Sequence, residues 1–144
     1  MGIQTWSAFA KFRSTHSNRM RNAGEWKACL FLRKLGHIIL AHNFRTERTE
    51  LDIISLDLAS ERCLHFTEVK AHNGPWKHPL SSQTALRRHK TRKAAQTFLF
   101  EYVAYLRAGG HKAPGMELNT LDCCICFDLI WVKRDGLEYF PSIF

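Results

Sequence analysis

The sequence lacks the features that would assign it to a specialised class of protein. No apolar run is long enough to span a bilayer, and the N-terminal segment has no apolar signal-peptide core. No internal repeat, low-complexity tract or Pro/Gly-rich linker divides the 144 residues, and 45% hydrophobic content excludes disorder as the default. We therefore expect one domain, residues 23–144, after a basic lead-in, residues 1–22. An organelle presequence is the alternative for that lead-in.

The cysteines have no familiar metal or disulfide spacing. They are Cys29, Cys63, Cys123, Cys124 and Cys126. Their number is odd, no CxxC pair occurs, and the last three fall in an apolar run where cysteine commonly acts as a small buried hydrophobe. The spacing therefore predicts neither a zinc site nor a disulfide framework. Reduced thiols favour a cytoplasmic protein.

Charge is distributed in blocks along the chain, whose net charge is +8. Residues 1–48 and residues 70–93 each carry +7, whereas residues 49–69 carry −4. An acidic block between two basic blocks is typical of a cation site within a polyanion-binding surface. A solvated basic face without a partner is the alternative, so charge alone leaves nucleic-acid binding open.

Hydrophobic periodicity predicts an α/β protein, with a mixed central sheet flanked by helices. The predicted order is helix, three strands, helix, strand (αβββαβ), and the three strands form a meander. The predicted elements are a helix Ala23–Leu35, strands His37–Phe44, Glu50–Leu58 and Arg62–Ala71, a helix Gln83–Leu106 capped by Ser81 or Ser82, and an internal strand Cys123–Lys133. Glu138–Phe144 is a short strand or a tail. Trp26 and Trp131 lie in apolar stripes, which predicts that both are in the core.

The residues best suited to chemistry lie on the second and third predicted strands. Because side chains alternate along a strand, Glu68 and Lys70 point to one face, and the neighbouring strand can bring Asp52 beside Glu68. Two adjacent carboxylates repel unless a cation lies between them, and their hard oxygens suit Mg²⁺ or Mn²⁺. Such a metal would polarise a scissile phosphate, and Lys70 would orient water or stabilise developing charge. A surface Glu-x-Lys ion pair is the alternative.

A series of segments from Gly24 onward occurs in the order and spacing of a known family. The segments are Gly24-Glu25, Ala28, Phe31-Leu32, Gly36, Asn43-Phe44-Arg45, Thr49–Ile54, Phe66–Lys70, Lys90 with Arg92, and Phe127-Asp128. Together they resemble the YraN-type (UPF0102-like) family of small bacterial proteins. That family is placed in the PD-(D/E)XK nuclease superfamily and is similar in layout to Holliday-junction resolvases. The resemblance implies a restriction-endonuclease-like core.

The resemblance also implies roles for individual residues. Asp52 and Glu68 would be metal ligands with the backbone carbonyl of Val69, and Lys70 would be the catalytic lysine. Glu25 would be a third carboxylate that reaches the site from the first helix. The alternative for Glu25 is a helix N-terminal residue that only favours the macrodipole. Glu50 is expected to be a solvated residue at the start of a strand.

Basic residues are expected to bind nucleic acid. They are Arg45, Arg87, Arg88, Lys90 and Arg92. The helix run Arg87–Lys93 would track a phosphate backbone, and a solvated helix face is the alternative. The chain departs from the family pattern at three places. Thr49 replaces a glycine, Ala71-His72 replaces an arginine, and Cys126 replaces the arginine before Phe127.

The expected function is therefore Mg²⁺- or Mn²⁺-dependent hydrolysis of DNA, with branched or structured DNA as one substrate class. The first rival is a nuclease fold that binds nucleic acid without cutting it. The second is a scaffolding protein whose basic charge serves only solubility. Branched-DNA enzymes of this superfamily tend to be dimers, so the resemblance leaves a homodimer open.

Overall fold

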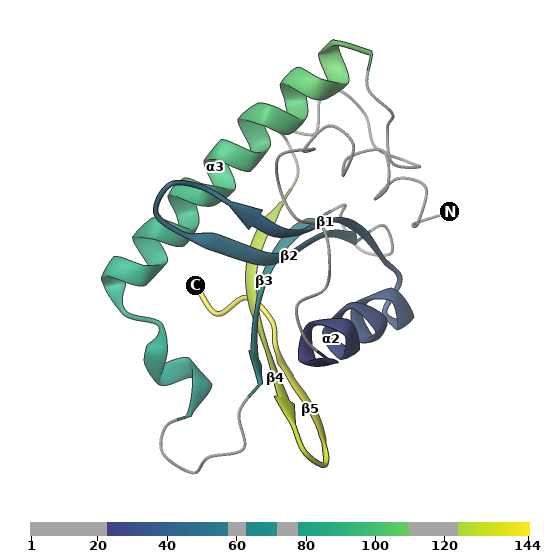
Figure 1. The fold of residues 1–144 in the computed structure, drawn as a ribbon, viewed down its shortest axis with the longest axis vertical. Helices are drawn as coiled ribbons and strands as arrows, with labels where there is room; N and C mark the ends of the chain where they lie inside the picture. Colours follow the sequence, from purple (N-terminus) through teal and green to yellow (C-terminus); the bar gives the residue numbers. More distant parts are fainter. Residues whose placement is uncertain (1–22, 58–62, 72–77, 110–123) are drawn as a thin grey trace.

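The computed structural model describes residues 23–57, 63–71, 78–109 and 124–144 as a five-stranded mixed sheet between two helices (Figure 1). The helices are α2 (Ala23–Lys34) and α3 (Ala85–Arg107), and a short 3-10 helix η1 (Pro79–Ser82) precedes α3. The strands are β1 (His37–Arg45), β2 (Glu50–Asp57), β3 (Cys63–Ala71), β4 (Ile125–Lys133) and β5 (Gly136–Phe140). The predicted lead-in, residues 1–22, lies outside the described residues. So does the predicted strand start at Cys123.

The strands lie in the order β1-β2-β3-β4-β5. The pairs β1–β2, β2–β3 and β4–β5 are antiparallel, whereas β3 and β4 run parallel, from Leu64 opposite Ile125 to Ala71 opposite Val132. The predicted α/β class and three-strand meander are thereby confirmed. β4 has a partner on each side, as expected for an internal strand. The C-terminal segment forms a strand over Gly136–Phe140 rather than a tail.

Each face of the sheet is covered by one helix, with α3 and α2 on opposite sides (Figure 1). Against α3, Phe98 packs edge to face on Phe44 and on Phe66, with ring centroids 5.3 and 5.9 Å apart. Against α2, Ala28 and Leu32 share a buried cluster with sheet residues. Burying these side chains removes apolar area from water, which is the main favourable term in folding. Among the described residues, no helix is both long and apolar enough to cross a membrane.

The buried face of α2 differs from the predicted stripe. Trp26 is 47% exposed, so its predicted core position is wrong, and Leu30 and Leu35 of the same helix region are exposed as well. The helix instead buries Gly24, Glu25, Ala28, Cys29 and Leu32. These positions recur at the spacing of one helical face, and Trp26 lies to the side of it. Trp131 is half-buried.

The ends of both helices follow from local sequence. Gly36, two residues after the end of α2, adopts a φ of 97°, a left-handed conformation that glycine reaches without strain. At the start of α3, the side chain of Thr84 accepts a hydrogen bond from the backbone N–H of Arg87. The predicted caps, Ser81 and Ser82, belong to η1 instead. The helix therefore begins at Ala85, two residues later than predicted.

Candidate active site

Asp52 and Glu68 lie next to each other at the outer end of the β2–β3 pairing. The last pair of this ladder is Ile53 opposite Thr67, and the two acids are the next residues on each strand. Beyond that pair, Asp52 Oδ2 accepts a hydrogen bond of 2.8 Å from the backbone N–H of Val69. The carboxylate of Asp52 is therefore held against β3, where strand alternation predicted it.

Glu68 is surrounded by donors from β3 and α3. Its Oε1 lies 2.9 Å from Lys70 Nζ and also pairs with the guanidinium of Arg87. Its Oε2 accepts a hydrogen bond from the side-chain amide of Gln83. Burial alone would raise the pKa of Glu68, but the hydrogen bonds and charges of Lys70 and Arg87 outweigh it and hold that pKa below its usual value. Glu68 is thus a carboxylate at neutral pH.

Asp52 has the opposite electrostatic environment. Burial raises its pKa to about 6, the Val69 N–H opposes that rise, and the nearby charges of Glu68, Glu25 and Glu50 add to it. Three acids therefore act on one partly buried carboxyl group. Such a concentration of negative charge favours a bound cation, and perturbed carboxyl groups of this kind cluster at functional sites.

Glu25 reaches this environment from the first turn of α2. It is 8% exposed, which is unusual for a glutamate, and its charge contributes to the raised pKa of Asp52. Glu25 does not line the cavity that Asp52 and Glu68 share, so its role as a third carboxylate stays a prediction beside the macrodipole alternative. Glu50 is half-buried, and its carboxylate pairs with Arg45 at 3.2 Å.

A small cavity lies between these side chains. Its lining includes Asp52, Glu68, Gln83 and Arg87, and its volume of about 20 Å³ holds one water or ion. Lys70 is not part of the lining but contacts Glu68 from the same strand. Glu50 and Asp128 also line the cavity, but Glu50 pairs with Arg45 and Asp128 pairs with His65. Asp52 and Glu68 are the predicted metal ligands among these carboxylates.

The five predicted nucleic-acid-binding residues do not form one surface. Arg87 turns into the carboxylate site and pairs with Glu68. Arg88 and Arg92 lie over the ring of Phe144, with guanidinium carbons 5.4 and 5.0 Å from its centroid. Packing against the C-terminal aromatic ring therefore occupies two of the four helix residues predicted to track phosphate.

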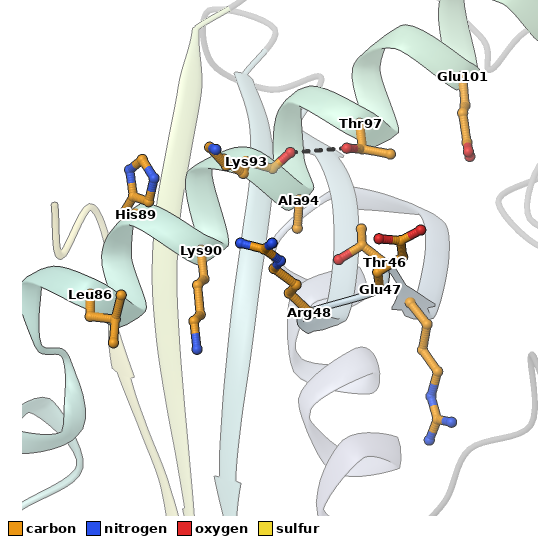
Figure 2. Close-up of a pocket in the computed structure, with 11 residues that line it drawn as sticks. Thr46, Glu47, Arg48, Leu86, His89, Lys90, Lys93, Ala94, Thr97 and Glu101 are labelled. Atoms are coloured by element: carbon orange, nitrogen blue, oxygen red, sulfur yellow. Dashed lines mark hydrogen bonds between the residues drawn. The ribbon is translucent and has the colours of Figure 1, made fainter.

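Arg45 and Lys90 line a separate groove between α3 and the β1–β2 turn. Its volume is about 590 Å³. Figure 2 shows Lys90 and Lys93 on α3 and Arg48 reaching toward them from the turn. The groove lining is Arg45, Thr46, Glu47, Arg48, Leu86, His89, Lys90, Lys93, Ala94, Thr97 and Glu101. We refer to it as the basic groove.

The basic groove and the carboxylate cavity are neighbours. On α3, Leu86 and Lys90 line the groove, while Arg87 and Thr91 line the cavity. On the turn, residues 45–48 line the groove and residues 49–52 line the cavity. A chain of phosphates lying in the groove would therefore pass close to the carboxylates.

Sequence reasoning missed Gln83, Phe144 and Arg48, whereas Lys93 ends the helix run Arg87–Lys93 that was predicted to track phosphate. Gln83 and Phe144 reach their partners only through the packing of α3 and of the C-terminal segment, so nothing in the local sequence marks them. Arg48 and Lys93 lie within the basic blocks, and net charge does give a signal for them. Their joint position in one groove depends on how α3 crosses the β1–β2 turn.

Comparison with known proteins identifies the family of the chain. Residues 24–132 match the model of the uncharacterised protein family UPF0102. A UPF0102 protein of Campylobacter concisus is 41% identical over 121 residues, which cover 84% of this chain and 89% of that protein. A UPF0102 protein of Campylobacter jejuni is 30% identical over 120 residues, covering 83% and 88%. The chain belongs to the UPF0102 family.

Proposed function

We propose that this protein is a metal-dependent endonuclease with a PD-(D/E)XK core that hydrolyses DNA phosphodiester bonds. The observation that carries the proposal is the assembly of Asp52, Glu68 and Lys70 into one site, beside a groove lined by basic side chains. Strand alternation alone allows such an arrangement. The packing of α3 adds Arg87 and Gln83 to it, which gives Glu68 a defined position.

The donor set fits Mg²⁺ or Mn²⁺. The donors are hard carboxylate oxygens, and the pKa of Asp52 is raised by burial and by three neighbouring acids. A divalent cation would relieve that repulsion. Asp52 and Glu68 would hold the ion, and the backbone carbonyl of Val69 is the further ligand implied by the family resemblance. When bound, the metal would polarise the scissile phosphate and lower the pKa of a water molecule.

Lys70 has a different role from the carboxylates. Its ammonium group lies 2.9 Å from Glu68, which keeps a donor at the edge of the site. From there it orients the attacking water or stabilises negative charge on the phosphate. Glu25 contributes negative charge from α2 rather than a contact with substrate.

The basic groove supplies the binding energy for DNA in this proposal. Arg48, Lys90 and Lys93 offer positive charge to the phosphate backbone, which needs no sequence-specific contact. The substrate class that we propose is DNA, including branched or structured DNA. A homodimer and a cytoplasmic location remain predictions from the sequence.

Binding of nucleic acid without cleavage is the second candidate function. One observation favours it: Glu68 already pairs with two cations of the chain itself, Lys70 and Arg87. An ion would have to displace the guanidinium of Arg87 to reach both oxygens of Glu68. If that displacement is too costly, the groove binds DNA and the carboxylates only order α3 against the sheet.

A cleavage assay separates the two candidates. We expect the purified full chain to cut at least one member of a panel of linear duplex, single-stranded and branched DNA with Mg²⁺ or Mn²⁺. Asp52→Asn should remove cleavage, because it deletes a metal ligand while conserving volume. Asp135→Asn, an exposed residue of the β4–β5 turn, is the matched control and should cut normally. Wild-type protein that binds the panel but cuts none of it with either metal would favour the binding function.

A further inference from the structure

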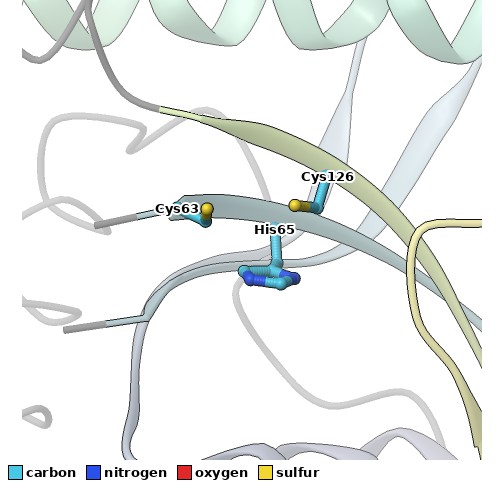
Figure 3. Close-up of side chains that lie close together, drawn as sticks. All are labelled: Cys63, His65 and Cys126. Carbon is cyan, nitrogen blue, oxygen red and sulfur yellow. The ribbon is translucent and has the colours of Figure 1, made fainter. Parts of the chain in front are cut away.

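A second group of metal-ligating side chains lies at the opposite end of β3. The ligand atoms of Cys63, His65 and Cys126 all lie within 4.8 Å of one another (Figure 3). Figure 3 shows the two sulfurs pointing toward each other from adjacent strands, with the His65 ring on the same side. His65 lies opposite Cys126 in the parallel β3–β4 pairing. The arrangement is therefore fixed by the sheet itself.

This group faces away from the candidate active site. Leu64 and Phe66 of β3 pack in the α3 cluster, so the alternate residues Cys63 and His65 point to the α2 side of the sheet. Glu68 contacts Arg87 of α3 and hence points to the other side. The two groups are separated both along β3 and across the sheet.

Cys124 adds a third sulfur. The backbone N–H of Leu64 donates to the carbonyl of Cys124, which places Cys124 beside the start of β3. Its Sγ lies 3.8 Å from Cys126 Sγ. Two thiolates on one tetrahedral Zn²⁺, each with a Zn–S bond of about 2.3 Å, are separated by about 3.8 Å. The spacing of this pair of sulfurs therefore matches that of two thiolates on one ion.

His65 is oriented by a carboxylate. Its Nδ1 lies 2.5 Å from Asp128 Oδ2, and Asp128 also accepts hydrogen bonds from the Tyr139 hydroxyl and the Ser142 backbone N–H. With Nδ1 held in this way, Nε2 is the ring nitrogen left for a metal. A carboxylate on the second nitrogen is the usual partner of a zinc-bound histidine, because it fixes the tautomer and the ring orientation.

We propose that Cys63, Cys124, Cys126 and His65 form a Zn²⁺ site, with Asp128 as the positioning residue of His65. Three thiolates and one imidazole are a complete tetrahedral set, which is typical of a structural rather than a catalytic zinc site. Soft sulfur ligands select zinc over magnesium, so the site is distinct from the carboxylates. The ion would join β3 to the start of β4.

Metal content and a cobalt spectrum test this site on the full chain. After expression with zinc we expect one Zn²⁺ per chain by elemental analysis and native mass spectrometry. Replacement by Co²⁺ should produce intense visible bands and a thiolate-to-cobalt charge-transfer band, which report tetrahedral sulfur coordination. The cobalt spectrum is measured on wild-type protein, so it does not depend on the folding of any variant. Absence of zinc together with absence of the charge-transfer band would overturn the proposal.

Variants then assign the ligands. Cys63→Ser and Cys126→Ser should each lose the ion, whereas Cys29→Ser, a buried cysteine of α2, should retain it. Asp128→Asn should weaken zinc binding by about 10- to 100-fold. Asp52→Ala should leave zinc content unchanged, which distinguishes this site from the carboxylates. Zinc retained in Cys63→Ser, or a disulfide among these cysteines in the isolated protein, would contradict the assignment.

Discussion

The two ends of β3 hold different chemistry. At its C-terminal end, Glu68 and Lys70 combine with Asp52 of β2 to give hard oxygen donors on the α3 side. At its N-terminal end, Cys63 and His65 combine with Cys126 of β4 to give sulfur and nitrogen donors on the α2 side. One strand thus contributes to two candidate metal sites with opposite ligand preferences.

The two sites also differ in how their charge is compensated. Glu68 pairs with Lys70 and Arg87, so the chain itself neutralises part of the carboxylate site. The pKa of Cys63 is instead raised by burial and by other thiols. A site that carries its own cations can form without an ion and exchange it, as a catalytic centre does. The thiol group has no ion pair with Lys or Arg among the described residues, so it gains more from a permanently bound ion.

The largest effect that we expect concerns Lys70. Lys70→Ala should lower the rate of Mg²⁺-dependent cleavage by about 100- to 1000-fold, the usual decrease when one transition-state interaction is deleted. Metal binding should persist, because Lys70 offers no ligand atom. Single-turnover cleavage and the Mg²⁺-induced rise in melting temperature measure the two effects separately.

Lys133→Ala provides the control for Lys70→Ala. Lys133 also lies on a strand and pairs with a glutamate, Glu138, but it neither lines the carboxylate cavity nor pairs with Glu68. This variant should cut at the wild-type rate. Equal activity of Lys70→Ala and Lys133→Ala would show that Lys70 is a surface ion-pair residue. The carboxylate end of β3 would then not be catalytic, and it would no longer differ from the thiol end in that respect.

Sequence could predict the carboxylate site because its parts are local. The strand period places Glu68 and Lys70 on one face, and a short connection brings Asp52 beside them. It could not predict that Gln83 and Arg87 contact Glu68, since both contacts depend on how α3 and the residues before it pack on the sheet. The same limit explains why Trp26 was misplaced: the buried face of α2 is defined by its contact with the sheet.

The cysteines show this limit more clearly. The absence of a CxxC pair led to the expectation that there is no zinc site. The parallel β3–β4 pairing nevertheless brings Cys63 beside residues that follow it by about 60 positions. Ligand spacing along a chain is informative only where the ligands belong to one local motif. Pairing between distant strands assembles a donor set that no spacing rule detects.

The basic groove gives a smaller, graded effect. Replacing Arg48, Lys90 and Lys93 together by alanine should weaken DNA binding and make it less sensitive to salt. The slope of log binding constant against log salt concentration should become shallower by about 0.9 for each phosphate that the protein no longer neutralises. Binding isotherms at several salt concentrations measure this slope. A charge-matched control replaces Arg107, Lys133 and Arg134, which do not line the groove, and should retain the wild-type slope. Equal slopes in the two triple variants would place the DNA on another surface.

The effect that we expect to be smallest concerns stability, and it follows from the pKa of Asp52. Folding raises this pKa from 3.8 to about 6, so between these values the folded state holds a proton that the unfolded state has released. The contribution of Asp52 to the free energy of unfolding is therefore most favourable below pH 3.8, and it is lost as the pH rises to about 6. At pH 7 the charged Asp52 lowers the free energy of unfolding by at most about 3 kcal/mol.

Asp52→Asn removes that charge and should therefore be more stable than wild type at pH 7.5 when no divalent metal is added. The advantage should shrink toward zero below pH 4, where Asp52 is protonated. Burial also lowers the pKa of His42 to about 4, which gives the opposite slope, but this contribution is present in both proteins and cancels in their difference. Urea unfolding of the two proteins across this pH range measures the difference. Added Mg²⁺ should stabilise wild type alone, because only wild type has both carboxylates that would hold the ion. A variant no more stable than wild type at any pH would show that Asp52 is not strained by its neighbours, and the contrast with the thiol site would then lose its electrostatic basis.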